Sequence, residues 1–301
     1  MPHLITIIGP TAIGKTALSL QLARQFDCEI VSCDSRQFFR EMTIGTAVPE
    51  PEELALVHHH FIHNKSIFDD YSVGDFEKDA LAALQNLFTK RQVAVMVGGS
   101  GLYVDAVLKG FDTFPDVPSG LREQVRKGYE DDGLGWLQQE LEKRDPMYYQ
   151  TVDTANPQRM MRALEVCLAT GQPYSSFLTR ENRERNFTPI IIGLDAPRDI
   201  LYDRINSRVD IMVREGLVEE ARRLYPHRDL NALQTVGYRE LFRYFDGEGS
   251  LEEALDEIKK NTRRFAKRQL TWFRRTEGVE WFDMTTPLSV ILDHIHQKIN
   301  T

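Results

Sequence analysis

The sequence has few cysteines and no long apolar run. Its three cysteines, Cys28, Cys33 and Cys167, form no C-x-x-C pair and no ligand set with histidines, which argues against a cysteine-based zinc site and against a disulfide framework. No apolar stretch approaches the ~20 residues of a membrane-spanning helix, and a strand-like run begins at residue 4 without a leader before it. We therefore expect a cytoplasmic protein with reduced thiols and no membrane partner.

Basic residues are also in short supply overall, since 37 Lys and Arg stand against 45 Asp and Glu, for a net charge of −8. This balance argues against a nucleic-acid partner, but the distribution argues for one. Residues 259–275 hold eight basic residues and no acid, interleaved with Phe265, Trp272 and Phe273. Such a stretch is either a solvated helix face or a surface for a phosphate backbone, which depends on local potential and not on net charge.

The most informative motif lies at residues 9–16, Gly-Pro-Thr-Ala-Ile-Gly-Lys-Thr. It matches the G-x-x-x-x-G-K-[ST] phosphate-binding loop, and it stands between an apolar β-branched run and a helix-forming run, as that loop requires. Backbone N–H groups and the helix N-terminus would hold an anionic oxygen, Lys15 would reach the outer phosphates, and the Thr16 hydroxyl would ligate Mg²⁺. The predicted phosphate-binding residues are Gly9, Pro10, Thr11, Ala12, Ile13, Gly14, Lys15 and Thr16, with Mg²⁺ as cofactor at Thr16.

Strand-like and helix-like segments alternate through the first hundred residues. Runs at 29–33 and 93–97 predict two further strands, which end on Asp34 and on a Gly-Gly-Ser-Gly segment containing Ser100. This alternation is typical of an α/β fold, a P-loop NTPase-like doubly wound parallel sheet whose ligands bind at the carboxyl ends of the strands. We therefore expect the P-loop, Asp34 and Ser100 to meet in one crevice.

The pattern changes to helices without strands over residues 115–185. An Asn156-Pro157 pair opens one helix and Gly171 closes it, and a strand-like run returns at 189–194. We therefore predict a core of 1–114 and 186–301 with a helical C-terminal part, interrupted by an inserted all-helical domain at 115–185.

The residues leave several chemistries open. The apolar run at 93–97 offers no carboxylate for Mg²⁺ of the kind motor ATPases and GTPases use, so the candidate acid is Asp34. A small-molecule kinase uses such an acid to accept a hydroxyl proton, and a loop-capping role for Asp34 is also open. His58, His59, His60 and His63 suggest a metal site, but no spaced carboxylate accompanies them in the sequence, so a loop is favoured.

Seven sequence motifs, which follow one another along the chain, point to one protein family. They lie at 9–16, 32–37, 44–47, 98–103, 156–165, 235–239 and 262–272. Together they resemble the bacterial tRNA dimethylallyltransferases over almost the entire chain. The resemblance implies transfer of a dimethylallyl group from dimethylallyl diphosphate to N6 of the adenosine immediately 3′ of the anticodon, with diphosphate as the leaving group held by the P-loop.

The resemblance also implies residue roles. Asp34 is the expected general base on the adenine amine, Ser100 (where Thr is commoner) contacts the reacting region, and Arg208 binds the diphosphate. The expected partners are the anticodon stem-loop of tRNA, bound in part by the inserted domain, and dimethylallyl diphosphate, and the protein is expected to be a monomer. The expected tRNA-contacting residues are Asp34, Ser35, Arg36, Gln37, Ser100, Arg122, Gln158, Arg159, Met160, Met161, Arg162, Gln234, Thr235, Val236, Gly237, Tyr238 and Arg239.

Two further alternatives stay open beside the kinase. One is a relative that prenylates free adenine nucleotides, against which the helical insertion and the basic stretch argue. The other is a non-catalytic RNA-binding module, which would not need Lys15, Asp34 and Arg208.

Overall fold

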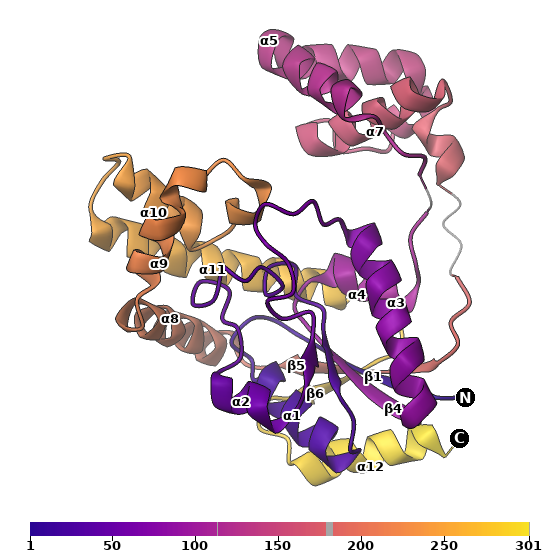
Figure 1. The fold of residues 1–301 in the computed structure, drawn as a ribbon, viewed down its shortest axis with the longest axis vertical. Coiled ribbons are helices and arrows are strands. Elements are labelled where there is room, and N and C mark those ends of the chain that lie inside the picture. Colours follow the sequence, from indigo (N-terminus) through magenta and orange to yellow (C-terminus); the bar gives the residue numbers. More distant parts are fainter. Residues whose placement is uncertain (113, 179–182, 301) are drawn as a thin grey trace. The chain divides into compact units, whose positions relative to one another are not determined.

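The computed structural model describes residues 1–112, 114–178 and 183–300. It divides into two compact units, of which unit 1 comprises Met1–Lys109 and Glu184–Thr301, and unit 2 comprises Gly110–Arg183 (Figure 1).

Unit 1 is built on a six-stranded sheet in which every pair of neighbours is parallel. The strands are β1 (His3–Ile8), β2 (Ile30–Ser32), β3 (His59–His60), β4 (Val93–Val97), β5 (Thr188–Asp195) and β6 (Val279–Asp283), in the order β3-β2-β4-β1-β5-β6. The α/β fold with a doubly wound parallel sheet is therefore confirmed. Strand β1 lies between β4 and β5, where the direction of winding changes and a ligand crevice is expected.

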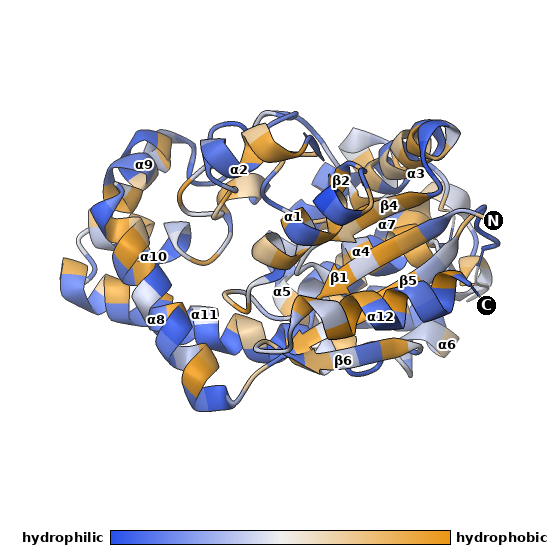
Figure 2. Cartoon of the chain, turned by 90° about the horizontal axis from the view of Figure 1, so that it is seen from below, coloured by the Kyte–Doolittle hydropathy of each residue, from blue (hydrophilic) through white to orange (hydrophobic). Residues whose placement is uncertain are grey.

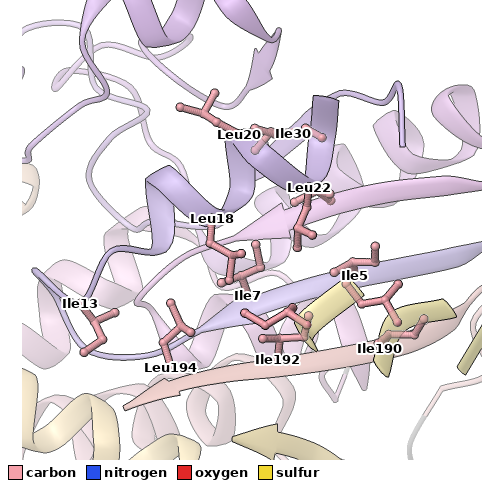
Figure 3. Packing of buried hydrophobic residues seen from close by; sticks show 14 of the residues in the cluster. Ile5, Ile7, Ile13, Leu18, Leu20, Leu22, Ile30, Ile190, Ile192 and Leu194 are labelled. Atoms are coloured by element: carbon pink, nitrogen blue, oxygen red, sulfur yellow. The ribbon is translucent and has the colours of Figure 1, made fainter. Parts of the chain in front are cut away.

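Alternate residues of each strand face opposite layers of helices. Ile5 and Ile7 of β1 pack against α1 (Lys15–Gln25), α8 (Arg198–Arg214) and α12 (Leu288–Ile299), and Figure 3 shows Leu18 and Leu22 of α1 over this face. Leu4 and Ile8 pack in the other layer, with α3 (Val73–Lys90) and α4 (Gly101–Leu108). Both faces are covered, so the central strands β1 and β4 are apolar along most of their length (Figure 2).

A third cluster in unit 1 joins the C-terminal helices to the segment after β2. It contains α9 (Leu217–Leu224), α10 (Tyr238–Phe245) and the first half of α11 (Leu251–Phe273), packed with Phe38, Phe39 and Met42. Short helices also occur at α2 (Pro51–Leu56), Tyr225–His227 and Asn231–Leu233.

Unit 2 is all helical, as predicted for the insertion. It contains α5 (Ser119–Arg144), α6 (Pro146–Tyr149), α7 (Pro157–Thr170) and a 3-10 turn, Tyr174–Phe177. Gly133 interrupts α5 with a φ of 73°, so α5 consists of two helical segments. The Asn156 side chain accepts a hydrogen bond from the Arg159 N–H at 3.2 Å, and Gly171 ends α7 with a φ of 69°.

Two strands were not predicted. His59–His60 was interpreted as loop, and Val279–Asp283 lies in a region expected to be helical. Both are edge strands of the sheet, where partial exposure weakens the apolar pattern by which buried strands are recognised. Among the described residues, no helix is long and apolar enough to cross a bilayer.

Candidate active site

A cavity of about 1240 Å³ opens in unit 1 at the carboxyl ends of the strands. Lys15 and Thr16 of the P-loop line it, together with Asp34, Ser100 and Arg208. The structure therefore brings together all three residues expected to be catalytic and six of the eight P-loop residues, 11–16.

The first two residues of the P-loop, Gly9 and Pro10, do not line the cavity, and Gly9 packs against β5. Gly9 and Pro10 are buried, and a Cβ on Gly9 would lie 2.8 Å from the Leu194 carbonyl oxygen of β5, so only glycine fits. The Lys15 ammonium donates to the carbonyl oxygens of Gly9 at 3.0 Å and Pro10 at 2.7 Å. The Lys15 side chain therefore folds back onto its own loop. The sequence predicted instead that it reaches the outer phosphates of a bound ligand.

The cavity contains cationic groups that are partly buried. Burial, and then the neighbouring Arg208 charge, lower the pKa of Lys15 to about 8, while Asp34 acts in the opposite direction. Burial also lowers the pKa of the Arg208 guanidinium, against the opposing effect of Asp34. Arg204, one helical turn before Arg208, donates from Nε to the Ala12 carbonyl oxygen at 2.7 Å and so fixes α8 to the P-loop.

Asp34 is oriented by its own backbone turn. Its Oδ1 accepts hydrogen bonds from the N–H groups of Arg36 at 2.9 Å and Gln37 at 3.4 Å. No described residue donates to Oδ2, so the second oxygen is available in the cavity that Asp34 lines. The carboxylate is therefore both positioned and able to accept a proton.

Ser100 joins the ends of β2 and β4. Its Oγ accepts a hydrogen bond from the Ser35 N–H at 3.0 Å, and it stands directly before α4. The ends of β2 and β4 can approach this closely because residue 98 is a glycine. A Cβ at this position would lie only 2.5 Å from the Cys33 carbonyl oxygen.

Gln269 of α11 was not predicted as a site residue. Its side chain is buried, and Oε1 accepts from the Thr11 N–H at 2.9 Å while Nε2 donates to the Gly99 carbonyl oxygen at 2.9 Å. It therefore connects the P-loop to the loop after β4. Its place inside the 262–272 motif was the one available signal.

Tyr238 has a different position from the one expected of an RNA contact. It is fully buried, its hydroxyl donates to Glu220 at 2.7 Å, and its ring occupies the place a Cβ on Gly45 would need. Glu220 also accepts the N–H groups of residues 43–45. The Tyr238 side chain therefore supports the 43–47 loop, and a tRNA contact in the segment 234–239 stays a prediction.

The neighbours of Tyr238 and of Asp34 differ in how far they are exposed. Gln234 and Arg239 are exposed, Thr235 and Val236 are partly so, and Gly237 is buried before α10. Ser35, Arg36 and Gln37 are partly buried, and the Gln37 amide is engaged with Ser32 and the Ala47 carbonyl oxygen.

In unit 2 the expected RNA-contacting residues divide by exposure. Arg122, Gln158 and Arg159 are exposed, and Met161 and Arg162 are partly buried. Met160 is fully buried in the core of unit 2, so the exposed neighbours Gln158 and Arg159 are the members of this segment that are open to RNA.

The basic stretch of α11 is partly committed to contacts within unit 1. Lys259 pairs with Asp210 at 2.6 Å and Arg263 donates to Asn206 at 2.6 Å. Lys267 and Arg268 are exposed, with the Arg268 guanidinium over the Phe265 ring. Lys267 and Arg268 are therefore among the side chains of this stretch that are open to a partner.

Comparisons with known proteins point in one direction. A family model described as IPP transferase matches residues 37–276. The chain is 60% identical over 305 residues to the tRNA dimethylallyltransferase of Flavobacterium psychrophilum, with 99% of each chain covered. It is 48% identical to tRNA dimethylallyltransferase 1 of Phocaeicola vulgatus, with 97% of each covered.

Solved structures agree. The full-length tRNA isopentenylpyrophosphate transferase of Bacillus halodurans has a TM-score of 0.73 at 39% identity, with 100% of this chain and 96% of that one covered. A eukaryotic dimethylallyltransferase acting on tRNA has a TM-score of 0.80 at 24% identity, with 95% and 74% covered, which is a likeness of fold.

Proposed function

We propose residue roles for this chain, which belongs to the IPP transferase family and is a tRNA dimethylallyltransferase. The reaction is transfer of the dimethylallyl group from dimethylallyl diphosphate to N6 of the adenosine immediately 3′ of the anticodon. The observation that carries the assignment is the joint placement of Lys15, Arg208 and Asp34 on one cavity. Relatives this similar over the whole chain favour the transferase over a kinase or an enzyme of free nucleotides.

The cationic side of the cavity would hold the donor diphosphate. Backbone N–H groups of residues 11–16 and the start of α1 suit an anion, and the charges of Lys15 and Arg208 would stabilise the leaving group as the allylic C–O bond breaks. Lys15 would exchange its contacts with its own loop carbonyls for the diphosphate oxygens.

Asp34 would act on the acceptor. An aromatic amine is a weak nucleophile, so as N6 bonds to the allylic carbon, its proton would pass to the accessible Oδ2 of Asp34. Ser100 would hold this carboxylate's loop in place through its bond to the Ser35 N–H.

The donor set of the cavity fits Mg²⁺. The Thr16 hydroxyl is an oxygen ligand of the kind this ion prefers, and Thr16 lines the cavity, where water and diphosphate oxygens would complete the coordination. When bound, Mg²⁺ would supply charge neutralisation to the departing diphosphate.

The tRNA would be bound by residues from both units. The exposed residues Arg122, Gln158 and Arg159 of unit 2, and Gln234 and Arg239 of unit 1, offer donors for an anticodon stem-loop. The target adenine must leave its stack to reach the cavity. One chain supplies every proposed group, so we propose a monomer, acting in the cytoplasm where its tRNA substrate is.

The sharpest test is Asp34→Asn. The amide oxygen preserves the acceptor for the Arg36 and Gln37 N–H groups, so the loop should keep its shape while the base is lost. We expect single-turnover prenyl transfer to fall by about 10²- to 10⁴-fold, with tRNA and diphosphate affinities nearly unchanged.

The matched control is Asp203→Asn, which alters an exposed carboxylate of α8 on the same cavity. Wild-type single-turnover rates in Asp34→Asn, or an equal loss in the control, would disprove the base assignment.

A further inference from the structure

A second group of polar residues lies outside the proposed active site, at the β3 edge of the sheet. One ligand atom each from Glu29, His58 and His60 lies within 4.8 Å of the others. The Glu29 Oε2 and His60 Nε2 are 2.7 Å apart, and the rings of His58 and His60 meet edge to face with centroids 4.6 Å apart. No carboxylate stands close to the histidines in the sequence. The fold supplies one from Glu29, which lies 31 positions before His60 along the chain.

The strand pairing explains this arrangement. Ile30 of β2 pairs with His59 of β3, and the Ile30 N–H donates to the His58 carbonyl oxygen at 3.0 Å. Because side chains alternate along a strand, His58 and His60 share one side while His59 takes the other. His59 accordingly lines the proposed active-site cavity, and His58 lines a separate cavity of about 590 Å³ together with Glu29.

We propose that Glu29, His58 and His60 form a binding site for Zn²⁺. Two imidazole nitrogens and one carboxylate oxygen are ligands that this ion takes at about 2.0–2.2 Å, which places ligand atoms roughly 3.4 Å apart. The observed separations, 2.7 Å to less than 4.8 Å, bracket that value, so small side-chain rotations suffice. Mg²⁺ is a poor competitor because it prefers oxygen ligands.

The site has access and a free coordination position. His58 is exposed, and the cavity beside it opens a path for the ion and for a water as fourth ligand. Zn²⁺ here would tie the edge strand β3 to β2 with coordinate bonds, in addition to the short ladder between them. Its expected effect is on the stability of this edge.

The test is a calorimetric titration of tag-free, chelator-stripped protein with Zn²⁺ in saturating Mg²⁺, so that the Mg²⁺ site proposed at Thr16 does not contribute. We expect one ion per chain. His58→Asn and Glu29→Gln should each weaken binding by at least about 100-fold, because each removes a ligand. His227→Asn, an exposed histidine elsewhere in unit 1, should bind as the wild type does.

Two further readouts separate binding from folding. Co²⁺ in place of Zn²⁺ should give visible d–d absorption in the wild type and lose it in both ligand variants. Without metal all variants should melt like the wild type, whereas Zn²⁺ should raise only the wild-type and His227→Asn melting temperatures. Zn²⁺ affinity and Co²⁺ spectra unchanged in His58→Asn and Glu29→Gln, or no binding by the wild type, would overturn the proposal.

Discussion

Lys15 is held by two carbonyl oxygens of its own loop, partly buried in a cavity that Arg208 also lines. Its pKa of about 8 lies far below the usual 10.5, so in the free protein it loses its proton as the pH rises through about 8. A bound diphosphate favours the charged ammonium and must raise this pKa. Donor binding is therefore coupled to proton uptake.

We expect donor affinity to decline above about pH 8, and binding at pH 8.5 to take up protons. The sign follows from the lowered pKa, because free Lys15 is then mostly neutral and the bound form is charged. Calorimetry of dimethylallyl diphosphate binding in buffers of different ionisation enthalpy measures the uptake. Lys15→Met should bind more weakly without that component, and an equal uptake in this variant would refute the coupling.

Single residues also show why motif matching was incomplete. Met160 lies in a matched segment, yet Met160, Ala163, Leu164 and Cys167 are spaced as one buried helix face. Helical periodicity alone would have assigned Met160 to the core and left Arg159 outside. Asp34 and Ser100 were predictable because each lies in the short segment after a strand, β2 or β4, whereas the bridge from Gln269 to Thr11 spans 258 positions and has no local signature.

At the scale of elements, α11 reaches the P-loop through one side chain. Gln269 satisfies the Thr11 N–H and the Gly99 carbonyl oxygen in a buried setting, so it fixes the distance between two loops that line the cavity. It acts as a positioning residue and makes no proposed contact with the reacting atoms.

Gln269→Ala should lower stability by about 1–3 kcal/mol, because the buried Gly99 carbonyl oxygen and the partly buried Thr11 N–H lose their partner. It should also weaken diphosphate binding by about tenfold, since Thr11 belongs to the anion-binding loop. Thermal melts and diphosphate titration measure the two effects. Thr271→Ala, an exposed change on the same helix, should alter neither, and a Gln269→Ala variant that melts early but binds normally would limit Gln269 to a structural role.

The central strands were predictable and the edge strands were not, for a physical reason. Val93–Val97 is buried on both faces and is apolar throughout, so its sequence marks it directly. In β6, Glu280 and Asp283 are exposed and only pairing with β5 organises the segment as a strand. The two residues of β3 depend likewise on their pairing with β2.

At the scale of the whole molecule, net negative charge is combined with basic residues placed where RNA is expected. Arg122 and Arg159 are exposed on the surface of unit 2 and are not part of its hydrophobic core. Their contribution should be electrostatic and therefore sensitive to salt.

Replacing both by glutamate should raise the KM for tRNA and reduce the slope of log affinity against log salt, by about 0.7–0.9 for each lost phosphate contact. The KM for dimethylallyl diphosphate should stay constant, because the proposed donor site lies in unit 1. Lys143→Glu, an exposed reversal on the same unit, is the control. If the double variant kept the wild-type salt slope, unit 2 would not bind the RNA backbone through these residues.

The order of strands also governs how the chain can fold during synthesis. Strand β1 begins at the third residue of the chain. One of its two neighbours is nevertheless β5, in which Thr188 pairs with His3. A ribosome therefore completes the contiguous unit 2 before it makes that neighbour, and until then one side of β1 is an open edge. Contacts this distant in sequence form slowly. Unit 2 is thus free to fold first, while the sheet of unit 1 is completed only after the C-terminal part of that unit has been made.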